Sequence, residues 1–177
     1  TTATTLLVGT MQVNKDVTFS MNSVNSNTIN GATLRIGGNL TNNCFVTGTL
    51  IELFGTTTMT ITQVPTRYLQ IDLVINKGAG IWNQVDLYWG SNGRTITYTS
   101  GIVNHTGIVY LPTFTSTVIF NTNGMTWNTI VYGTSGSTSL TLTSTLLADS
   151  INSGVAPASA SFLGTHGFIV NNFSYIV

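Results

Sequence analysis

The sequence predicts an all-β fold, a β-solenoid-like stack of short strands, and three observations support this. Short runs of Thr and of β-branched or apolar residues recur along the 177 residues, separated by Gly- and Asn-rich turns. One stretch occurs twice, with Gly80–Gly90 matching Gly124–Gly133 at a period of 43 to 45 residues. Only 6% of the residues are charged. That composition suits strands stacked about 4.8 Å apart, because like charges placed above one another repel.

The period is in the range typical of repeat architectures. Each repeat then corresponds to two coils of roughly 20 residues. The match continues past Gly90, where G-S-N-G-R-T lies over G-T-S-G-S-T in the second copy. Two other all-β architectures also fit short strands with frequent turns: a β-sandwich or jelly roll, and an intertwined trimeric β fibre.

In the first part of the chain, strand-like runs alternate with turns. Ser20–Asn30 is rich in Asn and Ser and predicts a loop, and Asn30-Gly31 predicts a tight turn because both residues tolerate positive φ. The expected strands are Thr5–Val8, Gln12–Phe19, Thr33–Ile36, Leu40–Val46, Thr49–Phe54 and Met59–Thr62.

The second part follows the same pattern. Tyr68–Ile75 is the longest expected strand there, and Asn76-Lys77-Gly78 is expected to be a turn after it. The two repeat copies follow, with short strands at Ile102-Val103, Ile108–Leu111, Thr117–Phe120 and finally Phe168–Val177. An irregular loop is expected at about 146–163, because Ser-Gly and Ala-Pro interrupt it. We interpret residues 1–177 as a single β domain, a segment of a larger or assembled fibre.

The composition excludes several classes of protein. Net charge is zero and the five basic residues are scattered singly, so a nucleic-acid surface is not expected. Membrane insertion is not expected either, since no apolar run is long enough to span a bilayer. Thr, Ser and Asn make up more than a third of the chain. Low charge removes the repulsion that keeps copies apart, which favours a homo-oligomer, such as a trimer or filament.

No catalytic, metal or cofactor site is predicted. Asp72 and Asp86 are the only carboxylate pair considered for polysaccharide cleavage, and surface positions explain both, so the chain is not expected to be an enzyme. His105 and His166 each lie in a Gly-flanked turn, and Cys44 is the single cysteine. Phosphate loops and dinucleotide fingerprints are absent.

Aromatic residues supply the candidate ligand-binding positions. Aromatic faces stack on the apolar C–H face of a sugar ring, and aromatic residues cluster in one third of the chain. Trp82 and Trp127 occupy equivalent repeat positions and are interpreted as packing residues. Trp89 has no tryptophan counterpart in the second copy, which makes it a candidate ligand contact. The full candidate set is Trp89, Tyr88, Tyr98 and Tyr110.

Several stretches resemble repeats of Thr/Asn/Gly-rich structural proteins of tailed phages. The longest are F-N-T-N-G-M-T-W-N-T-I at Phe120–Ile130, G-T-S-G-S-T-S-L-T-L-T-S at Gly133–Ser144 and F-L-G-T-H-G-F-I-V-N-N-F at Phe162–Phe173. Shorter ones are G-G-N-L-T at Gly37–Thr41 and L-V-I-N-K-G at Leu73–Gly78. The resemblance implies a tail-fibre or virion-appendage component that meets the host surface. It carries over no functional residue.

The resulting functional hypothesis is a virion structural and adhesive module. It would self-associate, reside on the virion outside the cell, and bind a host-surface glycan or other receptor. Two alternatives remain open. The chain could be a cellular surface-filament subunit that polymerises by strand complementation, or a jelly-roll capsid or decoration protein.

Overall fold

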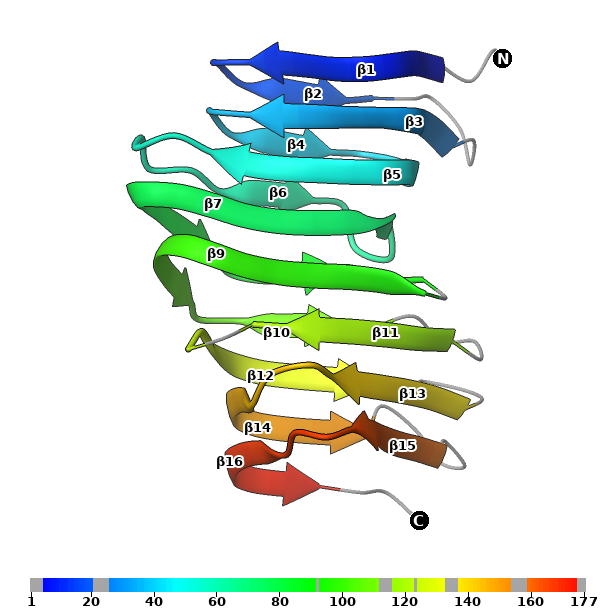
Figure 1. Ribbon diagram of the computed structural model, residues 1–177, viewed down its shortest axis with the longest axis vertical. Helices are drawn as coiled ribbons and strands as arrows, with labels where there is room; N and C mark the ends of the chain where they lie inside the picture. Colours follow the sequence, from blue (N-terminus) through cyan, green and yellow to red (C-terminus); the bar gives the residue numbers. More distant parts are fainter. Residues whose placement is uncertain are drawn as a thin grey trace.

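A computed structural model describes residues 5–20, 26–91, 93–111, 116–122, 124–132, 137–153 and 159–174. Within these residues every secondary-structure element is a β-strand, so the all-β prediction is confirmed. The strands stack in parallel into a β-solenoid, with β1 and the β15–β16 pair at opposite ends (Figure 1). The solenoid prediction is therefore correct. The sandwich, jelly-roll and intertwined-fibre alternatives do not describe this chain, which builds its coils from consecutive segments of itself.

Odd- and even-numbered strands form opposite walls of the solenoid. The odd strands make one eight-stranded parallel sheet in sequence order. They are β1 (Thr5–Val13), β3 (Ser26–Ile36), β5 (Phe45–Phe54), β7 (Leu69–Gln84), β9 (Arg94–His105), β11 (Ser116–Asn121), β13 (Ser137–Leu142) and β15 (Ser159–Gly164). A three-stranded sheet contains β2 (Val17–Phe19), β4 (Leu40–Asn42) and β6 (Ile61–Gln63). A five-stranded sheet contains β8 (Leu87–Tyr88), β10 (Ile108–Tyr110), β12 (Thr126–Tyr132), β14 (Leu146–Ser153) and β16 (Phe168–Ser174).

The strand register explains the sequence repeat. Leu87 pairs with Val109, and Val109 pairs with Ile130. Two coils therefore carry the chain from Leu87 to Ile130, which accounts for the period of 43 to 45 residues seen in the sequence.

Inward-facing side chains of successive coils form columns that fill the core. Because strand side chains alternate between faces, a register without slips keeps the same positions inside in every coil. One column descends the eight-stranded sheet through Leu34, Ile51, Leu73, Ile96, Phe120 and Leu142, all at most 3% exposed. Trp82 and Trp127 are buried in the same core, with ring centroids 6.2 Å apart, so the packing role predicted for them is confirmed.

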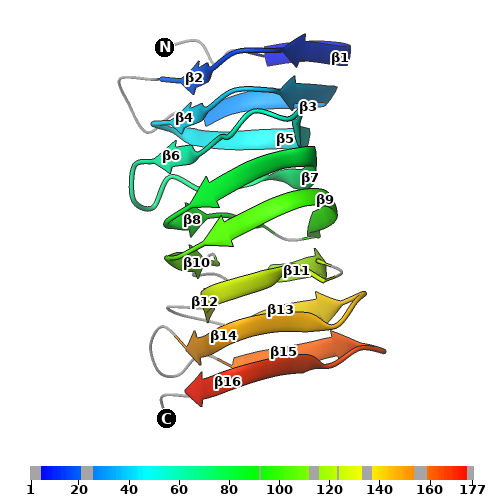
Figure 2. The ribbon, with the colours of Figure 1, turned by 90° about the vertical axis from the view of Figure 1, so that its left-hand side faces the viewer.

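Several predicted turns are bulges inside continuous strands. Asn76-Lys77-Gly78 lies within β7, where Gly78 has φ +59° and the register with β9 shifts between Asn76 and Ile81. Likewise, Gly31 has φ +68° inside β3. A bulge bends a strand without ending it. Both β7 and β9 accordingly continue around one corner of the solenoid (Figures 1 and 2).

The irregular loop expected at about 146–163 is wrong over two segments. Leu146–Ser153 forms β14, which buries Leu146, Ala148, Ile151 and Ser153, and Ser159–Gly164 forms β15. Pairing with β12 and β16 holds β14 extended despite its weak strand propensity. Residues 154–158, which contain the Ala-Pro interruption, lie outside the described part of the chain.

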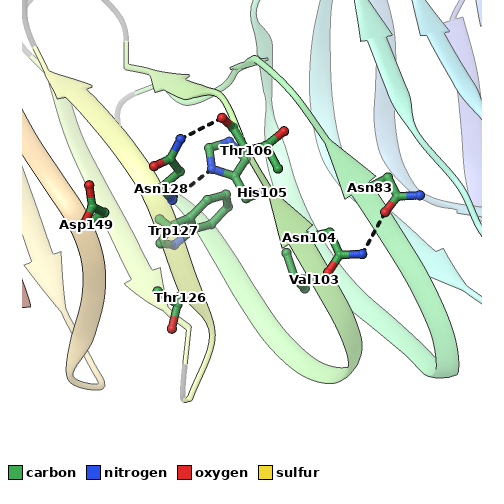
Figure 3. A pocket seen from close by; sticks show the side chains of 9 residues that line it. All are labelled: Asn83, Val103, Asn104, His105, Thr106, Thr126, Trp127, Asn128 and Asp149. Atoms are coloured by element: carbon green, nitrogen blue, oxygen red, sulfur yellow. Dashed lines mark hydrogen bonds between the residues drawn. The ribbon is translucent and has the colours of Figure 1, made fainter.

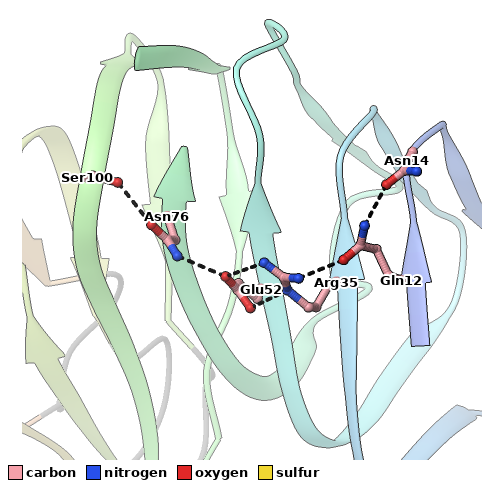
Figure 4. Close-up of polar contacts among 6 residues, drawn as sticks. All are labelled: Gln12, Asn14, Arg35, Glu52, Asn76 and Ser100. Carbon is pink, nitrogen blue, oxygen red and sulfur yellow. Dashed lines mark hydrogen bonds and ion pairs between the residues drawn. The ribbon is translucent and has the colours of Figure 1, made fainter. Parts of the chain in front are cut away.

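A polar ladder holds the outer surface of the N-terminal coils together (Figure 4). Arg35 donates to Glu52 at 2.8 Å and to Gln12 at 2.6 Å, and Asn76 donates to Glu52 at 2.9 Å. Ser100 extends the ladder by donating to Asn76 at 3.0 Å. Burial raises the pKa of Glu52, but the hydrogen bonds from Arg35 and Asn76 and the Arg35 charge outweigh burial, and its pKa lies below the usual value.

The core columns predict where substitutions cost most stability. Ile51→Ala removes a side chain that is 0% exposed between Leu34 and Leu73. The loss of burial and the cavity left behind should lower the free energy of unfolding by about 2–5 kcal/mol, measured by urea denaturation. Val85→Ala is the matched control, because Val85 is 63% exposed and its truncation should cost little. Equal effects of the two changes would contradict the column description.

Candidate functional site

A surface hollow lies at the corner between two consecutive coils, where the backbone ladder that joins them on either side is interrupted. Strand β9 pairs with β7 and β11, and β12 pairs with β10 and β14, so no ladder joins β9 to β12 in the described part of the chain. The tail of β9, Ile102–His105, turns the corner and pairs with β7 on one side. A groove of about 650 Å³ opens between that tail and the start of β12 (Figure 3).

Polar side chains from four successive coils line this groove, and the fourth coil contributes Asp149. Asn104 donates to Asn83 at 2.9 Å, and Asn128 donates to the backbone oxygen of Thr106 at 2.7 Å. The register places Asn83 beside Asn104, and Asp149 at the level of Asn128. Most of the lining residues are solvent-exposed: Asn83, Asn104, Thr106, Thr126 and Asp149.

His105 and Trp127 lie at the base of the groove. His105 is 8% exposed and Trp127 is 1% exposed, and their ring centroids are 5.0 Å apart at 79°. The His105 Nδ1 accepts the backbone N–H of Asn128 at 3.2 Å. We therefore assign the proton of the neutral ring to Nε2. That Nε2 and the Trp127 Nε1 have no hydrogen-bond partner among the described residues.

Burial controls the charge of His105. Burial lowers the pKa of His105 to about 4, and the nearby Asp86 carboxylate opposes the shift only in part. The imidazole is therefore neutral at pH 7, and the groove carries one formal charge, on Asp149. Asp149 in turn accepts a hydrogen bond from Asn171 at 2.8 Å.

The fold does not bring the four candidate aromatic residues together into one site. Trp89 is 0% exposed and its Nε1 donates to the Ile71 oxygen at 2.8 Å, so its ring packs in the core and does not face solvent. The expected ligand contact at Trp89 is therefore not available on the surface of the folded chain. Trp89 forms a parallel β-bridge with Leu69, the buried first residue of β7. Paired residues of parallel strands point to the same face, so Trp89 also points inward.

Two of the candidate tyrosines do form a surface pair. Tyr88 and Tyr110 are half-buried on adjacent strands and stack with centroids 4.5 Å apart at 7°, and Tyr68 meets Tyr88 edge-on at 5.7 Å. Tyr98 lies elsewhere. It lines a smaller hollow that shares Val103 and Thr126 with the groove, and its hydroxyl donates to the Gly101 oxygen at 2.8 Å.

The carboxylates considered for polysaccharide cleavage each bind the next coil. Asp72, in the eight-stranded sheet, accepts the backbone N–H of Thr95 at 2.9 Å. Asp86, between β7 and β8, accepts the backbone N–H of Ile108 at 2.9 Å. These bonds give both residues a structural role. Among the described residues no group of three or more His, Cys, Asp and Glu is placed to hold a metal ion.

Sequence reasoning missed the groove. The asparagines that line it looked like turn and ladder residues, and His105 looked like a surface residue of a turn. A possible signal was the recurrence of Asn83, Asn104 and Asn128 at close to one coil's spacing. The break in the ladder itself has no signature in the sequence, since it depends on how far β9 continues around the corner.

Comparison with protein-family models, curated proteins and solved structures finds no match for this chain. No helix among the described residues has the length and apolar character of a membrane span. The fold alone therefore defines the class of protein, a parallel β-solenoid with a polar surface groove.

The buried His105 predicts a pH dependence of stability. Above pH 6.5 the ring is neutral in both the folded and the unfolded chain. As pH falls below 6.5, His105 becomes protonated in the unfolded chain, whereas in the folded chain it stays neutral down to about pH 4. The free energy of unfolding should fall across that window by up to about 3 kcal/mol, since one pKa unit corresponds to about 1.4 kcal/mol.

The measurement is urea denaturation at pH 7.5 and pH 4.5. His105→Gln should remove most of the difference attributable to this residue, and His166→Gln, a change at an exposed histidine, is the matched control. The burial of His105 would be contradicted if wild type and His105→Gln lost the same free energy.

Proposed function

We propose that this chain is a structural and adhesive module of a virion appendage, such as a tail fibre, that self-associates and binds a glycan of the host surface. The observation that carries the proposal is the groove between β9 and β12. Its amide and hydroxyl side chains offer donors and acceptors without net repulsion of an uncharged ligand. Sugars present many hydroxyl groups, so they suit a site of this composition.

The rest of the molecule is consistent with an extracellular structural role. The core runs the length of the stack, and surface charge is confined to a few residues such as Arg35 and Glu52, which pair with one another. The resemblance to phage structural repeats favours a virion location. The stacked Tyr88 and Tyr110 provide a second candidate contact surface, separate from the groove.

Glycan binding is tested by screening the purified chain on a panel of bacterial surface polysaccharides. The double variant Asn104→Ala/Thr126→Ala removes two exposed polar groups from the groove. Each lost hydrogen bond costs about 0.5–1.5 kcal/mol. The affinity measured by titration calorimetry should therefore fall roughly tenfold or more.

Asn43→Ala is the control, because Asn43 is exposed and lies outside the groove. Tyr110→Ala distinguishes the two surfaces. A loss of affinity with Tyr110→Ala and none with the groove variant would move the binding site to the tyrosine pair. An absence of binding to every polysaccharide would overturn the adhesive part of the proposal.

A second candidate is a cellular surface-filament subunit. Among the described residues the edge strands β1 and β15 each have one sheet neighbour, so both edges offer backbone groups for strand complementation by another copy. This candidate predicts polymers on cells without virions. Immunogold labelling of producing cells and of purified virions separates it from the first proposal. The jelly-roll capsid alternative is set aside because the fold is a solenoid.

A further inference from the structure

At both ends of the solenoid, side chains are exposed at positions whose counterparts in the inner coils face the core. Met11 pairs with the buried Leu34 and heads one core column, yet it is 47% exposed. At the other end Phe173 pairs with Ile151, which is 0% exposed, and is itself 49% exposed. Within the described residues no further coil covers these side chains.

The C-terminal end is an apolar, uncharged surface. Phe162, Phe168 and Phe173 form one aromatic cluster, with ring centroids 4.8 Å apart between Phe162 and Phe168 and 6.0 Å apart between Phe168 and Phe173. Phe168 is 37% exposed although it pairs with the fully buried Leu146. Residues 159–174 contain no Asp, Glu, Lys or Arg.

The N-terminal end is apolar in its interior as well. Val13, Val17 and Phe19 are half-buried and pack against the core. The charged residues of this coil are Lys15 and Asp16, in the turn between β1 and β2, and Asp16 accepts the backbone N–H of Asn39 at 2.7 Å. An uncharged coil placed on this end therefore meets no like charge.

We propose that a second copy of this chain stacks head to tail, with its β1–β2 coil covering the β15–β16 coil of the first. This inference rests on the self-association included in the proposed function, and it names the surfaces. Head-to-tail stacking continues the parallel ladders that build the rest of the molecule. A tail-to-tail pair would instead join the two β15–β16 coils.

Side-chain size also favours the head-to-tail arrangement. The interior positions of β15 include Phe162 and Gly164, and those of β1 include Gly9 and Met11. A parallel register that sets Phe162 over Gly9 also sets Gly164 over Met11. Each large side chain then meets a glycine. Because this contact uses two different surfaces, it leaves one of each free and generates an open filament.

The test uses two variants, each blocked at one end, in sedimentation velocity experiments without glycan. Met11→Lys places a charge on the N-terminal end and Phe173→Lys places one on the C-terminal end. Wild type should show a mass that rises with concentration. Each variant alone should sediment as a monomer, with at least a tenfold weaker association constant. Their mixture should form one-to-one dimers through the two unblocked ends.

Thr10→Lys and Ile169→Lys are matched controls, because both residues are exposed, Thr10 is next to Met11 in β1, and Ile169 lies in β16 with Phe173. Both should assemble like wild type. Circular dichroism and a thermal melt establish that each variant is folded, and Phe173→Ser replaces Phe173→Lys if the latter unfolds.

Three outcomes would overturn the inference: a monomeric wild type, dimers of Met11→Lys alone, which indicate tail-to-tail pairing, or a mixture without heterodimers. Failure of glycan binding would leave the mass series unchanged, so the two proposals fail separately.

Discussion

The parallel backbone ladder between successive coils is the constraint on which the rest of the structure depends. Backbone hydrogen bonds hold each strand about 4.8 Å from the equivalent strand of the next coil. Equivalent side chains therefore line up in columns along the axis. An interior position must then be apolar in nearly every coil, as in the column that contains Ile51, Leu73 and Ile96. An outer position must avoid repeated like charge, and the alternation of Arg35, Glu52 and Asn76 meets that requirement.

The candidate site arises where this constraint is relaxed. Gly101, with φ +121°, lies opposite the bulge of β7, and there β9 turns the corner and goes on to pair with the tail of β7. The next coil does not follow the same path, and the bond from the Asn128 backbone to His105 is one of the side-chain links that replace the missing ladder there. The groove opens at this break, and at its base His105 is buried against Trp127, which lowers the pKa of its ring.

The aromatic residues show how local pattern and tertiary packing diverge. Tyr88 and Trp89 are neighbours in sequence, and alternation sends them to opposite faces. Which of the two faces solvent depends on the register of β8 with β10. The structure puts Tyr88 outside, stacked on Tyr110, and Trp89 in the core against Phe120. The absence of a tryptophan counterpart in the repeat was therefore a poor guide to exposure.

The sequence by itself determined the all-β class, the period of two coils per repeat and the packing role of Trp82 and Trp127. These features follow from residue spacing, which a regular ladder preserves. Tertiary structure decided that Asn30-Gly31 and Asn76-Lys77-Gly78 are bulges, that 146–153 is a strand, and that β9 and β12 separate to form the groove. Those outcomes depend on pairing with neighbouring coils, because a glycine at positive φ can either end a strand or bend it, and only the partner strand selects between the two.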